Sequence, residues 1–351
     1  MSRCISDVAY GRSNHFNLIR MLAATGVLVS HAFPLALGRG MSDPIADFLG
    51  ISLGTLCVYV FFVLSGFFIA SSYERSSIKR QFISARVLRL FPALGVCLVI
   101  TIIAGSLITT ELTTEFAIES VEYFFCNFTL FYGQTNLPGV FENNPFSDTI
   151  NGSLWTLNFE LLCYVLTLSL GLLGCLVATR WFIAILLVFL ALYLASFQIL
   201  LPYRLSMLLE LGWPYLIGTS LWVFRKYIQL SGPTASLALG IWITLVMTDA
   251  PTGTWIPFLG YLMIYLGYAD ASQILRYNSL GDYSYGVYIY AFPVQQLAAQ
   301  FGAITPIGNI IYSFPITLLL AILSWHMIEK PALRLKNSPI FSKRSMRVTR
   351  D

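Results

Sequence analysis

The chain has 351 residues, of which 57% are hydrophobic and only 11% charged, with a net charge of +4 and a mean hydropathy of +0.73. A soluble domain carries about 25% charged residues. The composition therefore excludes an ordinary soluble protein and predicts a membrane protein. The six cysteines show no paired spacing and fall mostly in apolar segments, so we expect neither structural disulfides nor a metal site.

Apolar segments long enough to cross a bilayer follow one another along most of the chain. They lie at 15–37, 51–71, 84–108, 153–177, 181–200, 207–224, 233–248, 255–269, 283–301 and 307–328. The first of them lacks the small-residue cleavage site of a signal peptide. We expect an all-α fold, a polytopic membrane helix bundle of about ten transmembrane helices, which forms a single domain over residues 1–351.

The distribution of Lys and Arg predicts the orientation of this bundle. With the N-terminus in the cytoplasm, only Arg39 and Arg204 fall on the outer side, and Arg20 lies within a span. Such an asymmetry follows the positive-inside rule. It predicts that both termini are cytoplasmic, with an N-terminal tail at 1–14 and a basic C-terminal tail at 329–351.

The longest external connection is predicted between the third and fourth spans, at about 109–152. Its first part has helical spacing with aromatic residues on one side, which predicts an interfacial or re-entrant helix. The stretch 133–152 is rich in turn-forming residues. No internal repeat supports an inverted-repeat transporter.

The first span carries two polar residues, Arg20 and His31, eleven residues apart. Eleven helical residues turn through roughly 1100° and rise about 16 Å, so both side chains leave the helix on nearly the same face. Ionisable groups inside a membrane are expensive to bury and are candidates for function. Arg20 is expected in the inner half of the span and His31 in the outer half. The alternatives are that Arg20 only reaches the inner interface and that His31 is a packed, hydrogen-bonded residue.

Two further groups of residues stand out in the second and third spans. Ser65 and Gly66 lie past the midpoint of the second span, where small residues let a neighbouring helix or a slender ligand approach closely. Arg86 and Arg89 share a face at the cytoplasmic start of the third span, and guanidinium groups suit phosphate recognition. Ordinary helix packing and plain positive-inside residues are the alternatives.

Glu160 lies near the start of the fourth span, close to Trp155 and Asn158. It is expected roughly 10 Å below the outer end, at a level similar to that of His31. A buried carboxylate needs a partner, and Glu160 would orient the imidazole if the two helices pack together. The spacing allows this contact without proving it.

These residues belong to a series of short motifs that covers nearly the whole chain. The motifs are Arg20 followed after ten residues by His31, FFVLSG at 61–66, RVLR at 86–89, NGSLWTLNFE at 151–160, SLGDYSYGVYIYAFP at 279–293 and IEKP at 328–331. In this order they resemble the integral-membrane acyltransferase-3 family. Its members O-acetylate sugars of surface polysaccharides, lipopolysaccharide, peptidoglycan and nodulation factors.

The resemblance implies an acyl-CoA co-substrate, usually acetyl-CoA, delivered from the cytoplasm, with no bound cofactor. It implies an acceptor hydroxyl on a cell-surface glycan or its lipid-linked precursor, and a multi-pass protein in the bacterial inner membrane. No nucleic-acid partner is expected. His31 resembles the essential histidine of the family, Arg20 its basic partner on the donor side, and Arg86 with Arg89 the pair that engages the CoA phosphates. A pantetheine arm of roughly 15–20 Å reaches from there towards His31.

The predicted site therefore has three parts. His31 acts as general base with Glu160 orienting it, and Arg20, Arg86 and Arg89 bind acyl-CoA. The remaining lining residues are Ser65, Gly66, Trp155, Asn158 and Tyr285. A direct ternary transfer and a two-step route through an acyl-histidine both fit this sequence.

The chain departs from the family pattern at three places. Asn17 replaces an acidic residue, Ala291 replaces a histidine found in many members, and His326 lies near the cytoplasmic end of the last span, where a structural role is expected. The chain has no room for the periplasmic domain of some relatives, so it acts alone or passes the acyl group to a separate periplasmic partner. Two other functions stay open: a glycan transporter or flippase with Arg20, His31 and Glu160 as an intramembrane relay, and a non-catalytic scaffold subunit.

Overall fold

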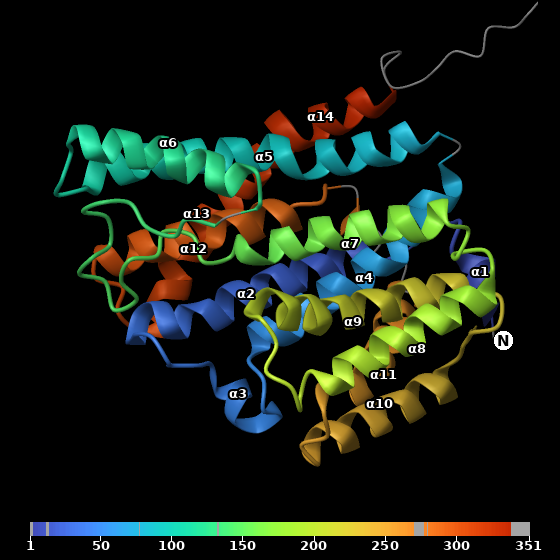
Figure 1. The fold of residues 1–351 in the computed structure, drawn as a ribbon. Helices are drawn as coiled ribbons and strands as arrows, with labels where there is room; N and C mark the ends of the chain where they lie inside the picture. The colour runs from blue at the N-terminus through green and yellow to red at the C-terminus, as the bar shows by residue number, and fades with distance from the viewer. Residues whose placement is uncertain are drawn as a thin grey trace, which may run out of the picture.

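A computed structural model describes residues 3–11, 14–76, 78–131, 133–269, 277–278 and 280–337 (Figure 1). Within these ranges the only strands are β1 (Arg3–Cys4) and β2 (Gln229–Leu230), which pair in antiparallel fashion. Nearly all the remaining regular structure is helical. The predicted all-α class is therefore confirmed.

Most of the helices are joined by short connections, and the longest one lies between α6 and α7. In chain order they are α1 (Ile5–Val8), α2 (Phe16–Leu37), α3 (Pro44–Leu49), α4 (Leu53–Arg75), α5 (Lys79–Ile108), α6 (Thr114–Phe128), α7 (Trp155–Leu172), α8 (Thr179–Ala195), α9 (Tyr203–Val223), α10 (Gly232–Met247), α11 (Thr252–Gly267), α12 (Ser284–Gln300) and α13 (Pro306–Ser324). The chain then continues through the π-helix η2 (Trp325–Glu329), α14 (Lys330–Arg334) and the 3-10 helix η3 (Leu335–Asn337).

Each of the ten predicted apolar segments forms one main helix. Five helical segments in the described residues are long and apolar enough to cross a membrane: α2, α4, α5, α7 and the continuous stretch Pro306–Arg334. The helices α8 and α10 are apolar but shorter. A membrane-type helical bundle is therefore supported, and the count of about ten spans stays a prediction.

The helices run roughly side by side (Figure 1), with α4 at the centre of the bundle. It packs against α2, α7, α9 and α11, whereas α12 and α13 pack against each other and against α2. The tightest contact joins α4 to α9. A Cβ atom added at Gly66 would lie 1.9 Å from the backbone oxygen of Tyr215, and one added at Gly218 would lie 1.9 Å from that of Val63. Gly66 therefore serves helix packing rather than the lining of a site.

Replacing Gly66 with alanine should lower the apparent melting temperature of the detergent-purified protein sharply. The atom in the way belongs to the backbone, so α4 and α9 must separate, and overpacking of this kind costs about 1–3 kcal/mol or more. Gly240 in α10 is the matched control, because a Cβ there meets nothing within 4 Å. Gly240→Ala should leave the melting temperature unchanged or raise it slightly. Equal melting temperatures for both variants would contradict the packing role of Gly66.

Residues 109–152, the predicted external connection, form one helix and a segment that folds into the bundle. The predicted interfacial or re-entrant helix is α6, which packs along α5 (Figure 1). The turn-rich residues that follow fold back against α12. Asn144 donates a hydrogen bond to Oε1 of Gln296 (2.7 Å), and Asn151 donates one to the backbone oxygen of Ile289 (2.9 Å). Both asparagines are buried, so the segment that leads into α7 lies within the bundle.

The described parts of both predicted tails are folded. Ile5 is fully buried, and β1 pairs with β2 beyond the end of α9. At the other end of the chain, Leu333 and Lys336 line a pocket. Residues 1–2, 12–13 and 338–351 lie outside the described residues, including most of the predicted basic C-terminal tail.

Candidate active site

A pocket of about 600 Å³ lies among α2, α4, α5, α7 and α12. The helices α2 and α5 begin at the same end of the bundle, which we call the basic end. Five cationic side chains from this half of the molecule line the pocket. These are Arg20, Arg75, Arg86, Arg89 and Lys336. All three arginines predicted to bind the donor therefore line one pocket, together with Ser65, Glu160 and Tyr285.

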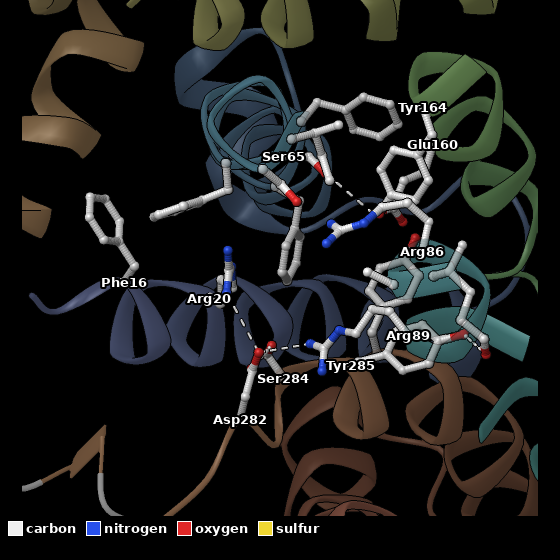
Figure 2. A pocket seen from close by; sticks show the side chains of 18 of the residues that line it. Phe16, Arg20, Ser65, Arg86, Arg89, Glu160, Tyr164, Asp282, Ser284 and Tyr285 are labelled. Atoms are coloured by element: carbon white, nitrogen blue, oxygen red, sulfur yellow. Dashed lines mark hydrogen bonds and ion pairs between the residues drawn. The ribbon is translucent and has the colours of Figure 1, made fainter. Parts of the chain in front are cut away.

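Asp282 forms ion pairs with two of these arginines, Arg20 and Arg89 (Figure 2). Its Oδ2 atom lies 2.8 Å from Nη2 of Arg89 and 3.5 Å from Nη1 of Arg20. Arg89 also pairs with Glu329, at 3.3 Å between Nη1 and Oε2. Burial raises the pKa of the Asp282 carboxyl, but the charges of Arg89 and Arg20 outweigh this effect and hold the pKa below its ordinary value. Asp282 and Glu329 belong to two of the motifs, yet the sequence analysis did not single them out.

Arg86 differs from its neighbour Arg89 because no carboxylate pairs with it among the described residues. Its Nε atom is buried without a hydrogen-bond partner. The guanidinium carbon lies 5.7 Å from the centre of the Tyr164 ring and 6.0 Å from that of Phe82. Figure 2 shows the side chain extended into the pocket. Arg86 is therefore available to bind an anion.

Lys336 and Arg75 add positive charge at the basic end of the pocket. Burial and the nearby charges of Arg86 and Arg75 lower the pKa of the Lys336 ammonium group. Within the described part of the chain, neither Lys336 nor Arg75 forms an ion pair with a carboxylate. Like charges held this close favour a bound anion with several charges, because it would relieve their repulsion.

Glu160 lies within the same pocket, on α7. Ser65 donates a hydrogen bond of 3.4 Å to Oε1 of Glu160, and the Tyr164 hydroxyl donates another to the same atom. The predicted hydrogen bond between Glu160 and His31 is not formed. Because the segment before α7 folds into the bundle, Glu160 lies deeper than a start at the surface would place it.

His31 lies beyond the end of the pocket that is opposite the basic end, which we call the deep end. The deep end includes Phe61 and Tyr288, whose ring centres are 5.8 Å apart. The Tyr288 hydroxyl shares a 2.5 Å hydrogen bond with the Thr156 hydroxyl. One turn further along α12, the ring centre of Phe292 lies 5.4 Å from that of His31. Phe292, the ring that contacts His31, therefore lies about 6 Å along α12 from Tyr288 in the pocket lining.

The other predicted lining residues occupy different places. The Tyr285 hydroxyl donates to the backbone oxygen of Leu90 (2.9 Å), and its ring lies in the pocket. Trp155 is 44% exposed and stacks edge-on against Phe159, and Asn158 donates a hydrogen bond to the backbone oxygen of Leu130. Trp155 and Asn158 therefore lie outside the pocket.

The three departures from the family pattern have different surroundings. Asn17 lines the pocket but brings no carboxylate to it, and Ala291 is buried in α12. His326 is exposed, 3.3 Å from the Tyr283 hydroxyl. The three residues of the alternative transporter relay do not lie together. Arg20 and Glu160 line the pocket, whereas His31 does not.

Known proteins match this chain over almost its whole length. It is 30% identical over 348 residues to an O-acetyl transferase of Shigella phage Sf6, with 94% of this chain and 99% of the relative covered. It is 28% identical over 385 residues to nodulation protein 10 of Rhizobium leguminosarum bv. viciae, with 96% and 97% covered. No solved structure matches it. The family model described as an acyltransferase domain matches residues 14–327, and the chain therefore belongs to this acyltransferase family.

Proposed function

We propose that this protein is a multi-pass O-acyltransferase of the bacterial inner membrane. It moves an acyl group, acetyl in the simplest case, from cytoplasmic acyl-CoA to a hydroxyl of a cell-surface glycan or its lipid-linked precursor. The proposal includes ten spans, one domain and cytoplasmic termini. The observation that carries it is the form of the pocket, which has cations without carboxylate partners at one end and uncharged aromatic rings, one turn from a half-buried histidine, at the other.

The donor fits this pocket from the basic end inward. Arg75, Arg86 and Lys336 supply the charge that the CoA phosphates need. The pantetheine arm would pass Ser65 and Glu160, whose oxygens suit its amide groups. The thioester would then lie near Phe61 and Tyr288, and rotation of these two rings would open the way to His31.

The chemistry requires one base and no metal ion. His31 accepts the proton of the acceptor hydroxyl as the hydroxyl oxygen attacks the thioester carbon. A C–O bond forms, the C–S bond breaks, and the proton passes to the departing thiolate, which yields the ester and free CoA. The name of the phage relative, an O-acetyl transferase, supports the reaction class. The glycan acceptor rests on the family resemblance.

Mass spectrometry of surface glycans from cells with and without this protein tests the proposal. The expected result is one additional acyl ester on one sugar only in cells that make the protein. Identical glycans in both cells would contradict the proposal. A change in the amount of surface glycan without any change in acylation would favour the transporter or flippase instead.

Donor binding should weaken at alkaline pH because of Lys336. A lowered pKa means that this lysine loses its proton, and with it its attraction for phosphate, at a lower pH than an ordinary lysine. The dissociation constant of acetyl-CoA, measured by isothermal titration calorimetry, should therefore rise as the pH increases through this lowered pKa. Lys336→Arg should remove the dependence, because arginine stays charged. The exposed Lys330 gives the control substitution Lys330→Arg, and a wild-type pH dependence in Lys336→Arg would refute the assignment.

A further inference from the structure

His31 has a buried ring nitrogen without a partner. Its Nδ1 atom is buried and forms no hydrogen bond. Four other buried side chains, on α12 and α13, share this condition at one atom each: Oε1 of Gln295, Oδ1 of Asn309, Oγ of Ser313 and Oγ1 of Thr317. All four of these residues are 0% exposed. We call them, together with His31, the polar seam.

The polar seam follows one face of α13. Asn309, Ser313 and Thr317 are spaced four residues apart, which places them on the same side of the helix. Asn309 donates a hydrogen bond of 3.0 Å to the backbone oxygen of Gln295, so this side of α13 faces α12. The seam therefore lies between two packed helices and not against lipid.

Two contacts place the seam at the level of His31. The Gln295 side chain donates a hydrogen bond of 2.9 Å to the backbone oxygen of Leu28, one helical turn before His31 on α2. An apolar cluster of Ala24, Val287 and Ala321 joins the same three helices one turn nearer the basic end. Thr317 lies one turn from Ala321 on α13, and Leu28 lies one turn from Ala24 on α2, in both cases away from the basic end. Thr317 and Leu28 therefore lie at the same height in the bundle.

Buried polar atoms without partners are expensive, and more so where no bulk water is near. Native proteins resolve such cases with ordered water, which needs two to four polar partners. The polar seam offers several such partners within two helical turns. Neither the pocket described above nor the small one beside Thr101 includes a residue of the seam, and water is the ligand that such a set of donors and acceptors binds.

We propose that Gln295, Ser313 and Thr317 bind ordered water that accepts a hydrogen bond from the Nδ1–H group of His31. The partner of one ring nitrogen decides which nitrogen carries the proton. With Nδ1 protonated, Nε2 is left as the base that accepts the proton of the acceptor hydroxyl. This inference rests on the proposed function. It gives α12 and α13 the positioning role that the sequence analysis assigned to Glu160.

Thr317 allows the sharpest test because two substitutions separate shape from chemistry. Thr317→Val keeps the volume of the side chain and removes the hydroxyl, whereas Thr317→Ser keeps the hydroxyl. Thr317→Val should lower kcat about five- to tenfold, the effect of one hydrogen bond, and leave the donor dissociation constant unchanged. Thr317→Ser should stay within about twofold of the wild type. Thr101 in α5, a buried threonine whose hydroxyl bonds the backbone of Cys97 (2.8 Å), gives the control Thr101→Val, which should keep full kcat.

The tautomer of His31 is a second readout that a merely structural role would not change. The chain has three histidines, so the ¹⁵N signals of His31 can be assigned in labelled protein by comparison with His31→Ala. The Nδ1-protonated form should dominate in the wild type and give way to a mixture in Thr317→Val. An unchanged tautomer, or an unchanged kcat, in Thr317→Val would overturn the inference. An inactive wild type would instead refute the proposed acyltransferase function.

Discussion

Replacing His31 with alanine should lower kcat for acyl transfer by about 10²- to 10⁴-fold, the usual contribution of a general base. The donor dissociation constant should stay within about twofold of the wild type. His31 lies beyond the aromatic layer formed by Phe61 and Tyr288, and it does not line the pocket that we assign to the donor. Binding and chemistry should therefore separate cleanly at this residue.

The measurement is transfer of a labelled acetyl group to glycan in purified membranes, with donor binding measured by titration. His326→Ala is the control, because His326 is an exposed histidine whose ring contacts only Tyr283 among the described aromatic residues. It should keep wild-type kcat. Full activity in His31→Ala would remove His31 from the chemistry. Loss of donor binding in that variant would show that the pocket reaches further than its lining indicates.

The two arginines of the RVLR motif should respond differently to alanine. Arg86→Ala should raise the donor dissociation constant about ten- to hundredfold, since hydrogen bonds to a charged group contribute about 1.5–3 kcal/mol each. Its stability should change little, because Arg86 has no carboxylate partner among the described residues. Arg89→Ala should instead destabilise the protein by about 3–5 kcal/mol, because it takes the paired cation from the buried Glu329 and leaves Asp282 with Arg20 alone.

Titration calorimetry and thermal unfolding in detergent separate these two effects. Lysine substitutions provide the matched pair, since each keeps the charge and loses the planar geometry. Arg89→Lys should recover part of the stability, and Arg86→Lys part of the affinity. If Arg86→Ala lost stability and kept donor affinity, while Arg89→Ala did the reverse, the assignment of the two residues would be wrong.

The sequence was sufficient to predict the helical class and three of the arginines that line the pocket. Helical spacing and the motifs identified Arg20, Arg86 and Arg89, and all three line one pocket. These residues act from regular helices, where position along the chain determines position in space. The counter-ion Asp282 was missed because it lies in a loop just before α12, and hydropathy carries no information about which arginines a loop carboxylate meets.

The contact that the spacing allowed between Glu160 and His31 is not formed, and the hydrogen bonds of Glu160 go to Ser65 and Tyr164 instead. The expected level of Glu160 assumed that the fourth span begins at the membrane surface, but residues 133–154 enter the bundle and bond to α12 through Asn144 and Asn151. No periodicity signals such an inward fold. Gly66 was misjudged for a related reason. The sequence showed a small residue and could not show that the backbone of Tyr215 occupies the space beside it.

Sealed inside-out membrane vesicles test the central proposal most directly, because they expose the cytoplasmic face to an added donor. Acetyl-CoA with a labelled acetyl group is supplied outside the vesicles, and an esterase is added before or after they are opened. If the acyl group passes from the basic end of the pocket to His31, labelled ester should form and resist the esterase until the vesicles are opened. Labelled ester that the esterase removes from intact vesicles, or ester that His31→Ala forms at the wild-type rate, would contradict the proposal.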